Sequence, residues 1–537
     1  MNAITRPLQR LPVVALVAAL AFAASAQESE HRLPELGSSA NALLTPAEAR
    51  QIGGSMLLQM RALNMVIDDG ELNRYVNDVG YRLVAHAGIQ KGMRFTFFVV
   101  RDNGINAFAA PGGYIGVNAG LITATEDESE LAGVLAHEIA HITQHHLERA
   151  EEDARKMSPL MALAMLGAAV VASQSGSGDA APAAVAAGMG LMAQRQINFT
   201  RKDEAEADRI GIDTLAAAGF DVDGMAGFFG RMERLMRPGA GSIQVPEFLR
   251  THPITSNRIS EAKALAHVIK QRQAHAPKRA IGKDMQWHDS TAPLAWLRSP
   301  SALDATHDDN GVRYRLMRER TRVLSADNDG ELLTYYRGNL ERGKGFDTLA
   351  NHYGYALALT RGGKADAALK ELQPLLASHP DNLDLQLAEA DALRHSGQVA
   401  AALGRYAGLS ARRPTDKVIA GAYADALLST AKRDDARKAA ALLRPLLDDE
   451  VEDPTLYRTF GRALDRSGQD VRAAEAYADA SYLSGHASDA LDQLQRLLKR
   501  KDLDYYARAR IQARVEYITP IALELARRGI TADKQGL

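Results

Sequence analysis

Two histidines and a glutamate are spaced for metal chemistry in the segment His137–His141, which reads HEIAH. Residues four apart on a helix lie one above the other on the same face, so the imidazoles of His137 and His141 can converge on one cation. Glu138 follows the first histidine directly, which lets its carboxylate take a proton from a metal-bound water. This spacing is the H-E-x-x-H motif, which is typical of zinc peptidases.

A catalytic zinc ion usually has three protein ligands and one open position, so a third ligand is required. An acidic cluster on a predicted helix supplies the candidates Glu204, Glu206 and Asp208. Glu204 and Asp208 share a helix face, whereas Glu206 points elsewhere. With Glu204 as the ligand, Asp208 one turn below could hold a ligand histidine by its other ring nitrogen. The alternative is that the cluster is the solvated acidic start of a helix, which is the commoner fate of such residues.

Several motifs together resemble peptidase family M48, a family of zinc metallopeptidases. They occur in the family's order over about residues 45–265 and include HEIAH, EAEAD from Glu204 to Asp208, THPITSNR ahead of a helix, NAFAAPGGYIGVNAGLI over 106–122 and a helix predicted over 68–85. The roles that this resemblance implies are one zinc ion held by His137, His141 and Glu204, a general base at Glu138, and a partner of a ligand histidine at Asp208.

Two further histidines follow HEIAH. If the helix continues, His145 lies about 12 Å along it from His137, too far to share the same ion. We therefore expect His145 and His146 to be surface residues or partners of the ligands, not ligands themselves.

His252 allows two interpretations. Pro253 favours an extended backbone at the residue before it, which would place His252 at the end of a loop. It is either a structural histidine near a helix start or, as the resemblance implies, a residue lying over the zinc ion. There it could stabilise the developing oxyanion, or take the fourth coordination position as a reversible latch that displaces the catalytic water. Arg258 is expected to anchor this loop.

A strand and a hairpin are predicted ahead of HEIAH. Residues 93–100 are rich in β-branched and aromatic side chains and predict a buried strand. Pro111-Gly112-Gly113 then marks a turn between two short strands. Residues 106–109 are a candidate edge strand that would bind an extended peptide through main-chain hydrogen bonds. An ordinary hairpin explains the same pattern equally well.

Residues 1–26 have the pattern of a cleavable signal peptide, with Arg6 and Arg10, an apolar run over 11–24 and Ala-Ser-Ala ending at Ala26. The apolar run is too short to span a membrane comfortably. The chain has no cysteine, which excludes disulfides, thiolate metal ligands and a lipid-anchoring cysteine. These features indicate the bacterial periplasm. With 64 basic and 66 acidic side chains, no general nucleic-acid role is indicated.

Two segments interrupt or follow the predicted peptidase. Residues 158–194 contain two apolar runs around a Ser/Gly turn and predict a helical hairpin. This hairpin either belongs to the core or is partly buried, where it covers the active-site cleft or touches a membrane surface or a hydrophobic client. After about residue 270 the periodicity is lost, and proline with mixed charge marks a linker over 271–309.

A period of 34 residues runs through the C-terminal part, which is the tetratricopeptide period. It relates Gly363 to Gly397, Pro380 to Pro414, and Ala356 to Ala390 and Ala424. We expect about four repeats over 347–500, between capping helices at 310–346 and a C-terminal cap at 501–537. Such a solenoid presents a concave surface to a partner.

The expected fold class is mainly α: a zincin-like α+β peptidase domain over 27–270 with a small β-sheet, followed by an α-helical tetratricopeptide-repeat solenoid. A secreted M48 peptidase joined to such repeats resembles the periplasmic proteases that assist β-barrel assembly in Gram-negative bacteria. The resemblance implies a zinc endopeptidase that degrades misfolded or stalled outer-membrane proteins, with repeats that dock clients or the β-barrel assembly machinery. The alternative is a chaperone or scaffold with a largely latent peptidase.

Overall fold

The computed structural model describes residues 45–89, 93–150, 152, 200–236, 246–275, 311–343, 345–447 and 452–527. The predicted signal peptide, almost all of the predicted hairpin and linker, and the end of the C-terminal cap lie outside these residues. Among the residues that are described, no helix combines the length and the apolar character that a membrane crossing requires.

A three-stranded sheet with the order β1-β3-β2 supports the motif residues. β1 (Thr96–Val100) pairs in parallel with β3 (Tyr114–Asn118), and β2 (Ala107–Ala110) pairs antiparallel with β3. The turn between β2 and β3 contains Gly112 and Gly113 at φ 76° and 84°, a region that glycine enters without steric cost. The predicted strand and hairpin are thus confirmed, and β2 lies at one edge of the sheet.

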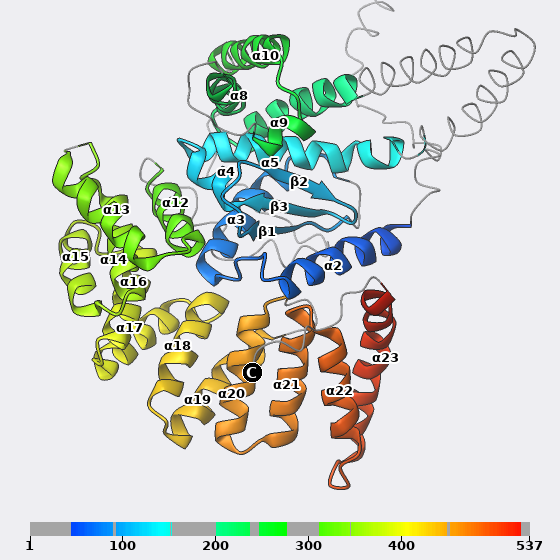
Figure 1. Cartoon of the computed structure of the whole chain (residues 1–537), viewed down its shortest axis with the longest axis vertical. Helices are drawn as coiled ribbons and strands as arrows, with labels where there is room; N and C mark the ends of the chain where they lie inside the picture. The colour runs from blue at the N-terminus through cyan, green and yellow to red at the C-terminus, as the bar shows by residue number, and fades with distance from the viewer. Residues whose placement is uncertain are drawn as a thin grey trace, which may run out of the picture.

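The helix that carries HEIAH is α5 (Glu128–Thr143), whose N-cap Asp127 accepts a hydrogen bond from the backbone of Glu130. It packs on β2, on α3 (Gly70–Val84) and on α8 (Asp223–Leu235). Figure 1 shows α8 and α10 on the side of α5 that faces away from the sheet. The other helices of this part are α2 (Pro46–Ala62), α4 (Ala119–Ala124), α9 (Glu247–Thr251), α10 (Ser256–His275) and an unlabelled helix over 200–217.

Successive pairs of helices make up the C-terminal part, residues 311–527, which we call the repeat region. Gly363 and Gly397 have φ 72° and 81° in matching turns of the 34-residue period. The helices are α12 (Val312–Ser325), α13 (Asp329–Arg342), α14 (Leu349–Arg361), α15 (Ala365–Ser378), α16 (Leu383–His395), α17 (Val399–Arg412), α18 (Lys417–Ser429), α19 (Arg433–Leu443), the short 3₁₀ helix η4 (Arg444–Leu446), α20 (Pro454–Ser467), α21 (Asp470–Leu483), α22 (Ala487–Leu498) and α23 (Tyr505–Arg527). The expected fold class, mainly α with one small sheet, is confirmed.

The repeat region curves along the peptidase part and contacts it at two places (Figure 1). At the inner junction α12 and α18 pack on α3, and Arg74 of α3 binds Asp416 at 2.7 Å. Arg320 of α12 binds Asp69 at 2.7 Å and Glu71 at 3.0 Å in the same junction. Partly buried contacts between charged or ionisable side chains therefore fasten the first half of the repeat region, from α12 to α18, to the peptidase part.

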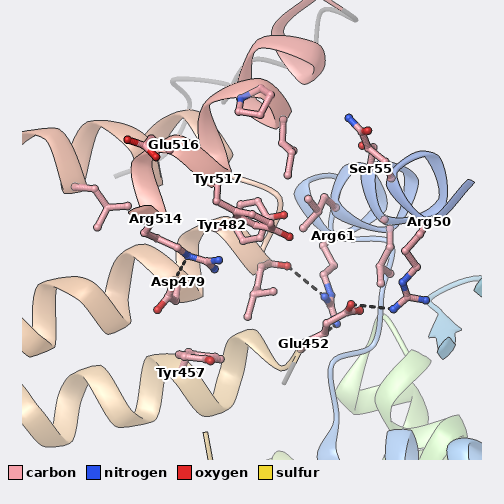
Figure 2. A pocket seen from close by; sticks show the side chains of 18 of the residues that line it. Arg50, Ser55, Arg61, Glu452, Tyr457, Asp479, Tyr482, Arg514, Glu516 and Tyr517 are labelled. Atoms are coloured by element: carbon pink, nitrogen blue, oxygen red, sulfur yellow. Dashed lines mark hydrogen bonds and ion pairs between the residues drawn. The ribbon is translucent and has the colours of Figure 1, made fainter. Parts of the chain in front are cut away.

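At the outer junction α2 faces α21 and α23 across a cavity of about 660 Å³. Figure 2 shows Arg50 and Arg61 of α2 reaching toward Glu452. Arg50 forms an ion pair with the Glu452 carboxylate at 3.1 Å, and Arg61 donates to the Glu452 carbonyl at 2.9 Å. The histidines of HEIAH do not line this cavity.

Candidate metal centre

Two glycines allow the neighbouring helices to approach α5 at the motif. A Cβ on Gly211, in the helix over 200–217, would lie 3.2 Å from the backbone nitrogen of His137. A Cβ on Gly133 of α5 would lie 3.0 Å from the backbone of Met225 in α8. Both distances are shorter than ordinary side-chain contacts, so the absence of a Cβ permits the close approach. The helix over 200–217 thereby places its acidic cluster against the HEIAH histidines.

Four side chains direct ligand atoms toward one point. These atoms lie within 4.8 Å of one another and belong to His137, His141, Glu204 and His252. The Nε2 atoms of the two α5 histidines are 3.0 Å apart, and His252 Nδ1 lies 2.9 Å from Glu204 Oε1. Imidazole nitrogens with one carboxylate oxygen are a donor set that zinc favours, so these residues fit the metal that the motif implies.

Asp208 and Arg258 contact the residues of this group without belonging to it. Asp208 Oδ1 lies 3.0 Å from His137 Nδ1, on the ring edge opposite the converging atoms. Arg258 binds Asp208 through two nitrogens at 2.7 Å each and Glu204 at 2.7 Å. It also donates to the Pro253 carbonyl at 2.9 Å, next to His252. Sequence reasoning assigned Arg258 only to the loop, whereas the structure shows that it also neutralises both carboxylates.

Glu138 lies between His252 and the edge strand. Its carboxylate is 3.5 Å from His252 Nε2 and accepts a hydrogen bond from the backbone of Ala109 in β2. Burial raises the pKa of Glu138 above its usual range, which suits a group that must both take and release a proton. Glu138, the expected base, therefore lies beside His252, the expected latch, and beside β2, the expected edge strand.

The ring environments of the two α5 histidines differ. Burial lowers the pKa of His137, but its hydrogen bonds with Asp208 and Glu204 outweigh burial and raise that pKa to about 10. Burial lowers the pKa of His141 to about 3. Burial also raises the pKa of Glu204, but hydrogen bonds with the three surrounding imidazoles hold that pKa well below its usual range. Glu204 is therefore an anion that its neighbours stabilise.

The end of α5 differs from the sequence-based expectation. α5 ends at Thr143, and His145 has φ 55°, so it is not one turn further along the same helix. A left-handed residue ends a helix, and a new turn starts at His146. His145 is not one of the converging residues, but His146 is only 4 % exposed and its Nδ1 lies 2.8 Å from His141 Nδ1.

Glu206 points away from Glu204 and Asp208, as expected, and faces His146. Its Oε2 lies 3.3 Å from His146 Nε2 and 2.8 Å from a nitrogen of Arg149. Burial and the charge of Arg149 lower the pKa of His146 to about 4, so this imidazole is neutral at pH 7. The only sequence signal for this contact was the His145-His146 doublet directly after the motif helix.

Comparison with known proteins covers both the peptidase part and the repeat region. A family model described as "Peptidase family M48" matches residues 71–266. The chain is 30% identical over 523 residues to the β-barrel assembly-enhancing protease of Escherichia coli (strain K12), covering 96% of this chain and 97% of that protein. It is 30% identical to the Yersinia pestis protein of the same name over 90% of this chain and 91% of that one. Over 34% of this chain it is 31% identical to half of the mitochondrial metalloendopeptidase OMA1 of Schizosaccharomyces pombe.

Proposed function

This chain belongs to peptidase family M48 and is a metalloendopeptidase, and from this premise we propose that it works in the periplasm on outer-membrane β-barrel proteins, cleaving those that are misfolded or stalled. The observation that carries the proposal is that the match to a β-barrel assembly-enhancing protease extends over both the metal centre and the repeat region. The signal-peptide pattern of residues 1–26 supports the periplasmic location.

The assignment of the site follows from its contacts. His137, His141 and Glu204 would hold one Zn²⁺, which when bound would polarise the scissile carbonyl and lower the pKa of the attacking water. Glu138 takes a proton from that water and passes it to the leaving amine. Asp208 Oδ1 lies 3.0 Å from His137 Nδ1, where the carboxylate favours a proton on that nitrogen and leaves His137 Nε2 free to bind the cation.

The edge strand β2 is the proposed site of the substrate backbone. Within the part of the chain that the structure describes, it pairs with β3 on one side only, so its outer main-chain groups face away from the sheet. The Ala109–Glu138 hydrogen bond sets this edge directly beside the proposed base. An extended substrate paired with β2 would be held mainly by its backbone, which gives binding with little sequence preference.

His252 is the proposed latch. Its Nδ1 lies 3.3 Å from His137 Nε2 and belongs to the converging group, as a fourth ligand would. A fourth protein ligand fills the position that a catalytic water needs, so the latched enzyme is inactive. The loop that carries His252 is held by Arg258 through the Pro253 carbonyl, and release of that loop would open the site.

The test compares zinc content and casein cleavage in four proteins. Wild type should bind one zinc per chain, and Glu138→Gln should keep the zinc but lose cleavage. His252→Ala should cleave faster than wild type, because its fourth position is open. Glu247→Gln, a change at an exposed glutamate of α9, is the matched control and should behave as wild type. Zinc-free wild-type protein, or full activity in Glu138→Gln, would contradict the assignment.

The repeat region is proposed to dock clients or the β-barrel assembly machinery, which concentrates the peptidase where barrels are assembled. The second candidate function, a chaperone or scaffold with a latent peptidase, is favoured by the position of His252 in the metal group. Cells that lack this protein distinguish the two. Rescue of barrel assembly by Glu138→Gln would support the scaffold role, and failure of that variant would support the protease role.

A further inference from the structure

The second ring nitrogen of His141 has a partner that the proposed mechanism does not use. In His137 the nitrogen opposite the metal group meets a carboxylate directly, at Asp208. In His141 the equivalent nitrogen meets another imidazole, that of His146, at 2.8 Å. The two rings lie edge to face, with centroids 4.7 Å apart and planes at 81°. His146 then meets Glu206 through its other nitrogen at 3.3 Å.

The direction of these hydrogen bonds follows from the number of protons. A neutral imidazole has one N–H donor and one acceptor nitrogen, and a carboxylate only accepts. Glu206 must therefore accept from His146 Nε2–H, which leaves His146 Nδ1 as an acceptor. His146 Nδ1 can then accept only from His141 Nδ1–H. His141 Nε2 consequently carries no proton, and its lone pair faces the point where the ligand atoms converge.

The backbone is bent to make this contact. His146 is five residues beyond His141, a spacing that would put the two side chains on different faces of a continuous helix. His145 breaks the helix with φ 55°, a conformation that few residues other than glycine adopt, and a new helical segment starts at His146. An unfavourable backbone conformation that persists indicates that the contact it permits is useful.

We propose that His146 and Glu206 are positioning residues for the metal site, which fix His141 as the Nδ1–H tautomer so that its Nε2 is ready to bind zinc. The proposal rests on the zinc site assigned above. Each of the two α5 histidines then has an acidic residue that holds the proton on its Nδ1. Asp208 does so directly for His137, and Glu206 does so for His141 through His146. Metal-bound histidines generally need such a partner, and loss of one typically weakens metal binding.

A second cation site explains the same residues less well. His146, Asp203 and Glu206 also have ligand atoms within 4.8 Å of one another. The guanidinium of Arg149 already pairs with both carboxylates, at 3.4 Å and 2.8 Å. A positive charge in that place opposes a metal ion and favours the hydrogen-bonded arrangement.

The first test measures the tautomer of His141 in the zinc-free full chain, by NMR of protein labelled with ¹⁵N in the histidine rings. The expected result is a proton on Nδ1 and none on Nε2. A proton on Nε2 would overturn the proposal, whether or not the protein binds zinc. In His146→Phe the tautomer should no longer be fixed, because the acceptor is lost.

The second test measures the zinc Kd by competition with a chelator. His146→Phe should weaken zinc binding about ten- to a hundredfold. His146→Gln should keep the Kd within about threefold of wild type, since an amide oxygen can accept from His141 and an amide nitrogen can donate to Glu206. His352→Phe in the repeat region is the control for loss of a histidine, with an unchanged Kd expected.

The outcomes separate this proposal from the function on which it rests. A folded His146→Phe protein with the Kd of wild type, or His146→Gln as weak as His146→Phe, would overturn the positioning role and leave the zinc site intact. Wild-type protein that binds no zinc would overturn the proposed function, and the tautomer measurement would still decide whether His146 fixes His141.

Discussion

Replacement of Arg258 by methionine should destabilise the peptidase part more than any other single change near the metal group. Arg258 is 7 % exposed and makes four hydrogen bonds or ion pairs, to Asp208, Glu204 and the Pro253 carbonyl. Methionine fills similar space but removes the guanidinium from two buried carboxylates, Asp208 and Glu204. Loss of one partner of a buried ion pair costs about 3–5 kcal/mol. For a domain of this size each kcal/mol lowers the Tm by about 2–4 °C, which gives a decrease of roughly 6–20 °C.

The assay is thermal unfolding of the zinc-free full chain, followed by circular dichroism at pH 7. Arg250→Met is the matched control, because Arg250 lies on the same segment but is exposed, and it should change stability by less than about 0.5 kcal/mol. Arg258→Lys should fall between the two, since lysine keeps the charge but cannot bind Asp208 through two nitrogens. If Arg258→Met melts within about 2 °C of the control, the buried carboxylates do not depend on this cation and the reasoning is wrong.

Three further predictions concern the junctions between the two parts. Burial raises the pKa of Glu71 from 4.5 to about 8, so in that range the folded chain holds a proton that the unfolded chain releases. Stability should therefore fall as the pH rises from 5 to 8, and Glu71→Gln should flatten this slope in Tm measurements. A Cβ on Gly485 would lie 2.0 Å from a carbonyl oxygen of α2, at φ 86°, so Gly485→Ala should cost about 1–3 kcal/mol in urea unfolding. Gly338→Ala, with open space around it, should be neutral or stabilising in the same assay. Tyr314 donates to Thr125 from a buried position, so Tyr314→Phe should cost about 1–2 kcal/mol by denaturant unfolding, and no loss would mean that water replaces the bond.

Local spacing explains what was predicted well. The four-residue interval in HEIAH and the interval from Glu204 to Asp208 each place two side chains on one helix face, and the structure brings these faces together. Gly363 and Gly397, which the 34-residue period relates, both have positive φ in matching turns. The helix spacings are visible in a sequence because each depends on residues about one turn apart, and the repeat is visible because it recurs at a fixed period.

Contacts between distant segments explain what was missed. Glu206 and His146 are 60 residues apart, and Arg258 and Asp208 are 50 apart, so no regular interval connects them. Their approach depends on how the helix over 200–217 packs against α5 and how α10 packs on α8. The break at His145 was missed for a related reason, because no glycine marks it and a histidine adopts the left-handed conformation there.

Attachment at both junctions changes how the repeat region can move. A solenoid held at one end bends freely, since each repeat touches only its neighbours. Here α18 is tied to α3, and α21 and α23 contact α2, so bending the repeats would move α2 and α3 relative to each other. The short connection between α2 and α3 includes Val66, which pairs with Val100 at the end of β1. A partner that straightens the repeats would therefore apply tension to the sheet itself, and the central strand β3 would carry that tension to β2 beside Glu138.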